Sequence, residues 1–262
     1  MSEASAGTPV TYDLSGVAAR ITIDRPERRN AINPEVTRVI SESLRRAEAD
    51  RARVVVLTGA GDKAFCAGGD LGGMTSEGAV AQHFARGEVG TLFDQMRRSP
   101  LPIIARVNGH ALAGGFGLML ACDLVIACDE AELGFPEIDL GLWPFMVTAI
   151  AHRDIPRKKA LELMLTGARI PATEGERLGF VNRIVPRAEL DSAVDDLAAT
   201  LALKSPLTTE LGKRSFYRSE DQSFEQALDY LTGMLTLCLQ SEDLAEGVSA
   251  FFEKRPPNWK GR

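Results

Sequence analysis

Two glycine-rich stretches contain the residue types best suited to hold a ligand. The first is Lys63-Ala-Phe-Cys-Ala-Gly-Gly-Asp-Leu-Gly-Gly73, and the second is Val107-Asn-Gly-His-Ala-Leu-Ala-Gly-Gly-Phe-Gly-Leu-Met-Leu-Ala-Cys-Asp123. Glycine lets a backbone approach a ligand closely, and the first N–H groups of a helix have no partner within the helix. Such loops can hydrogen-bond a polarised oxygen. Because glycine alone more often marks a tight turn, the interpretation depends on what surrounds these stretches.

Glu137 is the acid best placed for proton transfer. It lies between Pro136 and Ile138, within Ala131-Glu-Leu-Gly-Phe-Pro-Glu-Ile-Asp-Leu-Gly-Leu-Trp-Pro144. Loss of hydration among these apolar neighbours would raise the pKa of its carboxyl, which favours a role as general acid or base. A Glu directly after Pro is also typical of the first turn of a helix, where it stabilises free N–H groups.

Alternating strands and helices are predicted to position these residues. We expect strands at 16–24, 54–57, 103–107 and 124–127, and helices at 33–50, at 78–98 and from 114 onwards. This alternation predicts a mostly parallel α/β sheet, with ligands at the C-terminal ends of the strands. Both glycine-rich stretches follow such an end. Helices at 191–203, 206–216 and 224–239 then indicate a core of residues 1–191 and a helical region of residues 192–262 within one fold.

Composition restricts the possible partners. The 262 residues are 45% hydrophobic and 25% charged, and the formal net charge is −6. A negative chain is poorly suited to nucleic acid or to anionic membranes, and its apolar runs are far shorter than the roughly 20 residues of a membrane helix. The four cysteines have no paired spacing, and the N-terminus lacks the pattern of a secretory signal. We therefore expect a cytoplasmic protein.

Other catalytic motifs are missing from the sequence. The chain has no GxSxG nucleophile elbow, no phosphate loop and no His/Cys/Asp cluster with metal-site spacing, so we expect no metal. His110 is interpreted as a structural donor. Cys66 has no charged neighbour that would lower the pKa of its thiol, which argues against a nucleophilic role.

The three motifs, in this order, resemble the crotonase family, also called the enoyl-CoA hydratase/isomerase family. The likeness extends to Asp24-Arg-Pro-Glu-Arg-Arg-Asn-Ala-Ile-Asn33, to Leu165-Thr-Gly167, to 172–182 and to 246–260, so it covers nearly the whole chain. The resemblance implies a spiral of ββα turns with a C-terminal helical trimerisation region. It also implies an acyl-CoA substrate, no separate cofactor, and assembly as a homotrimer or a dimer of trimers.

The resemblance also implies roles for single residues. Gly69 and Gly114 match the positions whose N–H groups form the oxyanion hole for a thioester enolate, and Glu137 matches one of two acids in the hydratases of this family. The second acidic position falls at Gly117, which has no side chain to hold water. A further departure is the run Gly141-Leu-Trp-Pro-Phe-Met-Val-Thr148, whose large side chains are expected to reshape the acyl pocket. The positions that match the substrate and coenzyme A path are Arg29, Ala31, Ala67, Gly69, Asp70, Leu71, Gly72, Gly114, Trp143, Phe251 and Lys254.

The leading hypothesis is an enoyl-CoA hydratase-like enzyme with Glu137 as acid and base. The first alternative is an enoyl-CoA delta-isomerase, because one carboxylate can shuttle a proton between carbons without water. A decarboxylase or a dehydratase on a CoA or carrier-protein thioester would use the same oxyanion hole. Because Gly117 removes one acid, a catalytically weak acyl-CoA-binding subunit is the non-enzymatic alternative.

Overall fold

The computed structural model describes residues 8–70 and 79–262. Its strands form two sheets, with the order β1-β2-β3-β5-β7-β10 in the larger and β4-β6-β8-β9 in the smaller. The larger sheet contains β1 (Val10–Ser15), β2 (Ala18–Ile23), β3 (Val54–Gly59), β5 (Ile103–Val107), β7 (Leu124–Cys128) and β10 (Arg183–Val185). The smaller contains β4 (Ala64–Cys66), β6 (His110–Leu112), β8 (Glu132–Gly134) and β9 (Arg169–Pro171).

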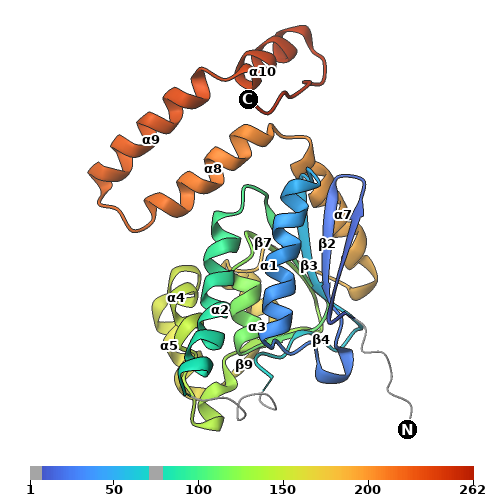
Figure 1. Ribbon diagram of the computed structural model, residues 1–262, viewed down its shortest axis with the longest axis vertical. Helices are drawn as coiled ribbons and strands as arrows, with labels where there is room; N and C mark the ends of the chain where they lie inside the picture. Colours follow the sequence, from blue (N-terminus) through green and yellow to red (C-terminus); the bar gives the residue numbers. More distant parts are fainter. Residues whose placement is uncertain (1–7, 71–78) are drawn as a thin grey trace.

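The chain repeats a strand–strand–helix turn that connects the two sheets. Successive turns are β3-β4-α2, β5-β6-α3 and β7-β8-α4, and the first strand of each turn lies in the larger sheet while the second lies in the smaller. The helices of these turns are α2 (Ala79–Arg98), α3 (Gly114–Leu120) and α4 (Phe145–Asp154). This is the ββα spiral that the resemblance implies, and Figure 1 shows its helices stacked beside the sheets.

The first turn of the spiral follows from local sequence. Helix α1 (Pro34–Ala49) begins as predicted, because the Asn33 side chain accepts a hydrogen bond from the Val36 N–H at 2.8 Å and Pro34 occupies the first turn. Strand β3 is buried along its whole length, in agreement with its apolar sequence. It extends to Gly59, two residues beyond the predicted end.

The predicted strand at 16–24 is confirmed as β2, and it forms a hairpin with β1, where no strand is predicted. Gly16 has a φ of +60° and lies in the turn that joins β1 to β2, and the two strands pair antiparallel from Val10↔Ile23 to Ser15↔Ala18. Strand β1 escaped prediction, although Val10, Tyr12 and Leu14 alternate with polar residues; the strand is short, lies at the edge of the sheet and exposes most of its side chains.

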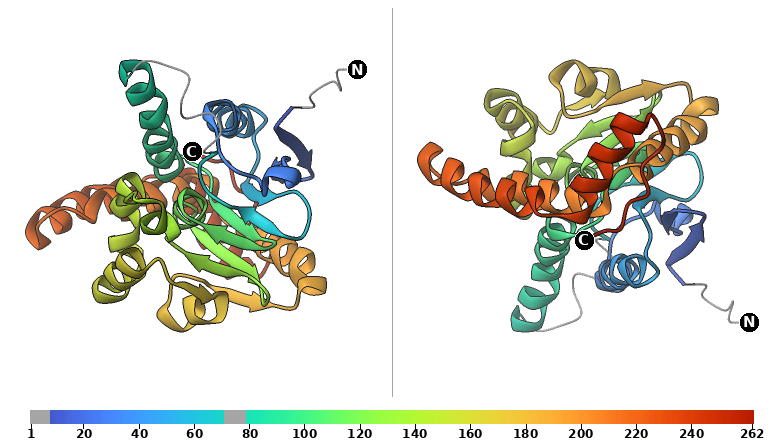
Figure 2. Two further views of the ribbon diagram at one scale, coloured as in Figure 1. Left: turned by 90° about the horizontal axis from the view of Figure 1, so that it is seen from below. Right: turned by 90° about the horizontal axis from the view of Figure 1, so that it is seen from above.

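The other helices follow the spiral. They are α5 (Arg157–Thr166), α6 (Ala172–Leu178), α7 (Leu190–Ala202), α8 (Pro206–Ser219), α9 (Phe224–Leu239) and α10 (Glu242–Glu253), with 3-10 turns η1 (Pro26–Arg28), η3 (Pro136–Leu140) and η4 (Arg187–Glu189). Helix α7 packs against β3, β5 and β7, where Asp191 accepts a hydrogen bond from Arg106 at 2.8 Å. Helices α8, α9 and α10 extend beyond this core, as the orange-red segment in both views of Figure 2 shows.

A buried ion pair joins this extension to the core. The Lys213 ammonium on α8 lies 2.7 Å from Oδ2 of Asp123 and donates hydrogen bonds to the carbonyls of Met96 and Leu101. The Tyr217 hydroxyl donates to the other oxygen of Asp123 at 2.8 Å. The polar groups of Lys213, Asp123 and Tyr217 are therefore all paired, which compensates for the removal of the charges from water.

Within residues 8–70 and 79–262, no helix is both long enough and apolar enough to cross a bilayer.

Candidate active site

Three neighbouring strands of the smaller sheet bring the two glycine loops and Glu137 together. Strands β4, β6 and β8 are adjacent and parallel, with Cys66 paired to Ala111 and Ala111 to Leu133. Because the carboxyl ends of parallel strands meet at one edge of a sheet, the segments after them lie side by side. Gly69 lies three residues after the end of β4, Gly114 two after the end of β6, and Glu137 three after the end of β8.

The first loop is aligned by the segment at 29–32. The Ala67 N–H donates to the Arg29 carbonyl, the Ile32 N–H to the Gly68 carbonyl, and the Asp70 N–H to the Ile32 carbonyl, all within 2.7–3.0 Å. In an extended chain the N–H groups of successive residues point to opposite sides. The N–H of Gly69 therefore points away from this segment, and it donates no hydrogen bond to another residue that the structure describes.

The second loop contains an unusual backbone conformation that the sequence does not reveal. Ala113 has φ 53° and ψ −131°, a region that alanine rarely adopts, and its N–H donates to the Gly134 carbonyl at 2.9 Å. This turn places Gly114 at the first position of α3, where the N–H has no partner within the helix. A strained residue beside a free N–H group is a feature of functional loops, so Ala113 belongs to the candidate site.

The two loops touch backbone to backbone because their glycines lack side chains. A Cβ on Gly115 would lie 2.1 Å from the Cys66 carbonyl oxygen, and one on Gly68 would lie 2.6 Å from Cβ of Ala113 and 3.3 Å from N of Gly114. A Cβ on Gly114 would lie 3.8 Å from N of Gly69. The nitrogen atoms of Gly69 and Gly114 are therefore near neighbours, as two donors to one oxygen must be.

Glu137 combines burial with an unpaired oxygen. It lies in η3, directly after β8, and its Oε2 is buried without a hydrogen-bond partner in the described chain. Burial raises the pKa of its carboxyl, and a hydrogen bond with its own backbone opposes this only in part. This is the direction that the sequence predicts, and it brings the carboxyl closer to a state in which it both gives and takes a proton near neutrality.

Gly117 lies against an apolar wall. A Cβ at this position would lie 2.6 Å from Cγ2 of Val147 on α4 and 3.2 Å from Cζ of Phe93 on α2. Both side chains are buried. The space that a second acid would need is thus already filled.

Apolar side chains surround the segment after Glu137. Leu140, Leu142 and Phe145 are exposed, whereas Trp143 packs against the core and its indole N–H donates to the Thr148 hydroxyl at 3.2 Å. These residues offer an apolar surface on the segment that follows Glu137. Cys66, in contrast, is fully buried, and burial raises the pKa of its thiol to about 12, which agrees with the argument against a nucleophilic role.

Several residues that match the coenzyme A path lie at or next to the first loop. Arg29, Ala31 and Ala67 border the first loop, where Arg29 is exposed with a φ of 51° and the Ala31 carbonyl accepts a hydrogen bond from Arg25. The Asp70 carboxylate also accepts from Arg25, at 2.8 Å. Leu71 and Gly72 lie outside the described residues.

Phe251 and Lys254 lie far from the glycine loops of their own chain. Both belong to the end of α10, which is at the opposite end of the molecule from β4 (Figure 1), and Phe251 is 78% exposed. This single chain therefore does not bring the two residues to Glu137. Contact of these two residues with a ligand at Glu137 would therefore require a second copy of the chain.

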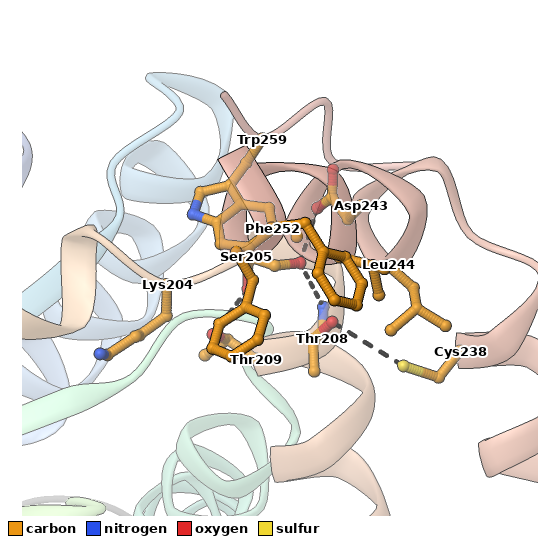
Figure 3. A pocket seen from close by; sticks show the side chains of 12 residues that line it. Lys204, Ser205, Thr208, Thr209, Cys238, Asp243, Leu244, Phe252 and Trp259 are labelled. Atoms are coloured by element: carbon orange, nitrogen blue, oxygen red, sulfur yellow. Dashed lines mark hydrogen bonds between the residues drawn. The ribbon is translucent and has the colours of Figure 1, made fainter. Parts of the chain in front are cut away.

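Phe251 borders a separate hollow of about 720 Å³ between α8, α10 and the C-terminal tail. Figure 3 shows Phe252, Trp259 and Leu244 around this hollow, with the Ser205 hydroxyl hydrogen-bonded to Asp243. The lining is mostly apolar and lies on the extension, away from the three strands that carry Glu137. We therefore treat it as a feature distinct from the candidate active site.

The other acids and histidines have weaker links to the candidate active site. The Asp139 side chain is exposed and lies near the end of α5. A Cβ added to Gly167, which caps that helix, would lie 2.9 Å from its Oδ2. Glu88 is exposed on α2, and Glu77 lies outside the described residues. His110 accepts a hydrogen bond from the Glu132 N–H at 3.1 Å, which agrees with a structural role, although as an acceptor rather than the predicted donor.

Comparison with known proteins supports one family. The sequence profile described as Enoyl-CoA hydratase/isomerase matches residues 14–262. The chain is 34% identical to the (E)-benzylidenesuccinyl-CoA hydratase of Thauera aromatica over 257 residues, with 97% of this chain and 99% of that protein covered. It is 35% identical to the carnitinyl-CoA dehydratase of Proteus mirabilis over 254 residues, covering 94% and 96%.

Solved structures agree with the sequence relatives. The enoyl-CoA hydratase of Bacillus anthracis superposes with a TM-score of 0.92 at 32% identity, covering 97% of this chain and all of that one. Together, the strand–strand–helix spiral, the two touching glycine loops and these similarities show that the chain belongs to the enoyl-CoA hydratase/isomerase, or crotonase, family.

Proposed function

We propose that this protein is an enoyl-CoA hydratase-like enzyme that acts on a 2-enoyl-CoA thioester. The observation that carries the proposal is the Oε2 of Glu137, which is buried without a hydrogen-bond partner among the described residues and lies at the same sheet edge as the two glycine loops. An unpaired carboxyl oxygen is costly to bury, so its presence there supports a role with substrate. The named relatives, a hydratase and a dehydratase, add support.

In this proposal the N–H groups of Gly69 and Gly114 hold the thioester oxygen. Addition of water to C3 moves an electron pair onto that oxygen, and two fixed donors stabilise the enolate by about 3 kcal/mol or more each. The Glu137 carboxylate takes a proton from the attacking water, whose oxygen bonds to C3. The resulting carboxyl then gives that proton to C2 as the enolate collapses, which restores the carboxylate.

Turnover of defined thioesters tests this assignment. Crotonyl-CoA and a 3-enoyl-CoA are incubated with the protein while the absorbance of the conjugated enoyl group is followed. Loss of absorbance from crotonyl-CoA indicates hydration, and Glu137→Gln is expected to abolish most of it. Full activity of Glu137→Gln would contradict the assigned proton transfer.

The apolar wall at Gly117 favours a second candidate, an enoyl-CoA delta-isomerase. Val147 and Phe93 occupy the place where a water-holding acid would lie, and one carboxylate suffices to move a proton between two carbons. The same assay separates the two reactions, because isomerisation of a 3-enoyl-CoA raises the absorbance. Tight CoA-thioester binding with neither change would instead indicate a binding subunit.

We also propose self-association as a homotrimer or a dimer of trimers. Helix α9 has no buried residue, and it exposes the large apolar side chains of Phe224, Leu228, Leu235 and Leu239. Apolar patches of this kind are typical of protein interfaces. Analytical ultracentrifugation is expected to give three or six times the 28.3 kDa chain mass, and a monomer at micromolar concentration would contradict the proposal.

A further inference from the structure

Asn30 connects three segments of the backbone through its side-chain amide. Its Nδ2 donates to the Ala60 carbonyl at 3.0 Å and to the Ala64 carbonyl at 2.7 Å, while its Oδ1 accepts from the Arg25 N–H at 3.1 Å. Asn30 is only 1% exposed. Both N–H groups and the oxygen of the amide therefore have backbone partners away from water, and loss of the amide would deprive each partner of a hydrogen bond.

The backbone at Asn30 adopts a conformation that needs such support. Arg29 has a φ of 51° and Asn30 a φ of 57°, so two consecutive residues other than glycine lie in the left-handed region. Asparagine tolerates this region better than most residues, but arginine does not. Conformations of this kind persist where surrounding contacts hold them. The buried Asn30 amide supplies three such contacts to the turn.

This turn determines how the first glycine loop is aligned. The Ile32 N–H donates to the Gly68 carbonyl at 2.7 Å, and Ile32 pairs with Gly69 in a parallel bridge. The Arg29 carbonyl accepts a hydrogen bond from the same loop. Asn30 lies between these two pairing residues. Its amide therefore ties the segment that aligns the Gly69 backbone to the link between β3 and β4.

The Ala64 carbonyl is a point where the segments that lead to both glycine loops meet. Ala64 is the first residue of β4, the strand that leads to Gly69. The same carbonyl also accepts a hydrogen bond from Nδ2 of Asn108 at 3.3 Å, and Asn108 is 2% exposed. Asn108 lies between β5 and β6, and β6 leads to Gly114. The two buried amides therefore connect the backbone before Gly69 with the backbone before Gly114.

We infer that Asn30 is a positioning residue for the oxyanion hole, which holds the turn at 29–32 against the β3–β4 link and so keeps the Gly69 N–H in line with that of Gly114. The inference rests on the proposed function. It assigns Asn30 no contact with substrate, because its amide is directed to the backbone of Arg25, Ala60 and Ala64. Loss of the amide should therefore change the reaction through the geometry of the first loop.

Asn30→Gly tests the inference, because glycine adopts the left-handed conformation without strain and only the amide is lost. The variant is expected to lower kcat by about 10- to 100-fold, since a small displacement of a catalytic group is costly. Its KM should change by less than threefold, since the hole acts more on the enolate than on the bound substrate. Asn182→Ala is the matched control. It removes an amide hydrogen bond to the Val125 N–H at 2.7 Å, near the start of β7, and is expected to keep full activity.

A spectroscopic measurement makes the outcome independent of turnover. An aryl-substituted enoyl-CoA absorbs at longer wavelength when its carbonyl is polarised. The wild-type protein is expected to shift this absorption, Asn182→Ala to shift it equally, and Asn30→Gly to shift it less. A shift with the wild type and an equal shift with N30G would overturn the inference, as would a wild-type kcat in folded N30G. No shift and no turnover with the wild type would instead contradict the proposed function.

Asn30→Asp covers the case in which N30G does not fold. Aspartate is close to asparagine in size and keeps an acceptor for the Arg25 N–H, but it has at most one donor for the carbonyls of Ala60 and Ala64. Its kcat is expected to fall at least tenfold and its absorption shift to decrease, while circular dichroism checks that it is folded. A folded N30D with the kcat and the shift of the wild type would contradict the positioning role.

Discussion

Gly117 packs its backbone directly against Val147, so that a Cβ at position 117 would lie 2.6 Å from Cγ2 of that valine. The absence of the second acid has therefore not left an empty space beside Gly117. The surrounding helices have closed over the position, with Phe93 on the other side. In the proposed mechanism, the use of a single carboxylate therefore follows from the packing around Gly117 and not from one exchanged residue.

Gly117→Ala is expected to lower the free energy of unfolding by about 1–3 kcal/mol, because the new methyl group overpacks Val147. Gly117→Glu is expected to destabilise further and to gain no hydratase activity. Urea denaturation and the crotonyl-CoA assay measure the two effects. Gly87→Ala on α2 is the control, since no atom of the described residues lies within 4 Å of its Cβ, and it should be neutral or stabilising. A faster Gly117→Glu enzyme of unchanged stability would contradict this account.

Glu137→Gln is expected to stabilise the protein at neutral pH while it removes activity. The folded-state pKa of Glu137 is raised by burial, so the wild type loses stability as pH rises through that pKa and the carboxylate becomes charged. Glutamine carries no charge, so the stability difference should be near zero below the ordinary Glu pKa and should grow as pH rises. Urea denaturation at several pH values measures it. A difference that stays constant with pH would contradict a raised pKa.

Gly115→Ala is expected to lower kcat/KM by about 100-fold, because a displacement of about 1 Å in a catalytic group can have that effect. The new methyl group would lie 2.1 Å from the Cys66 carbonyl oxygen, so the two loops must separate. Steady-state kinetics measure the change, and circular dichroism checks that the variant is folded. Unchanged kinetics in a folded variant would show that the contact between the loops does not set the oxyanion hole.

Asp123→Asn is expected to lower the free energy of unfolding by about 3–5 kcal/mol, because it leaves the buried Lys213 ammonium without its counter-charge. The Lys213 side chain is 8% exposed, and burial already lowers the pKa of its ammonium. Asp94→Asn breaks an exposed pair with Arg98 and should cost less than 1 kcal/mol. Equal effects of the two substitutions in urea denaturation would contradict the proposed importance of the α8 anchor.

The sequence predicts the parts of the fold that have strong local signals. Helix α1 has a capping Asn33 and a regular apolar face, and strand β3 is apolar throughout, so both are found within two residues of the prediction. The short strands β4, β6 and β8 were not predicted, because three residues are too few to show a period. Their pairing is nevertheless what brings the loops and Glu137 to one edge.

The candidate site was predicted by resemblance more than by pattern. The loops around Gly69 and Gly114 and the acid at 137 could be named from their motifs, and the raised pKa of Glu137 could be expected from its apolar neighbours. The conformation of Ala113 and the hydrogen bonds of the Asn30 amide could not, because both depend on contacts between segments distant in sequence. Asn30 follows Pro26-Glu-Arg-Arg29 and, in sequence, resembles an ordinary turn residue.

The carbonyl stretching frequency of a bound thioester tests the central claim most directly. Crotonyl-CoA labelled with ¹³C at C1 is bound to Glu137→Gln, which should retain both N–H donors, and its difference infrared spectrum is recorded against the free ligand in water. Two hydrogen bonds from Gly69 and Gly114 to one oxygen predict a shift of the labelled carbonyl band to lower frequency, and a smaller shift when Gly115→Ala is added. A bound ligand whose carbonyl band is unchanged from that in water would contradict the oxyanion hole.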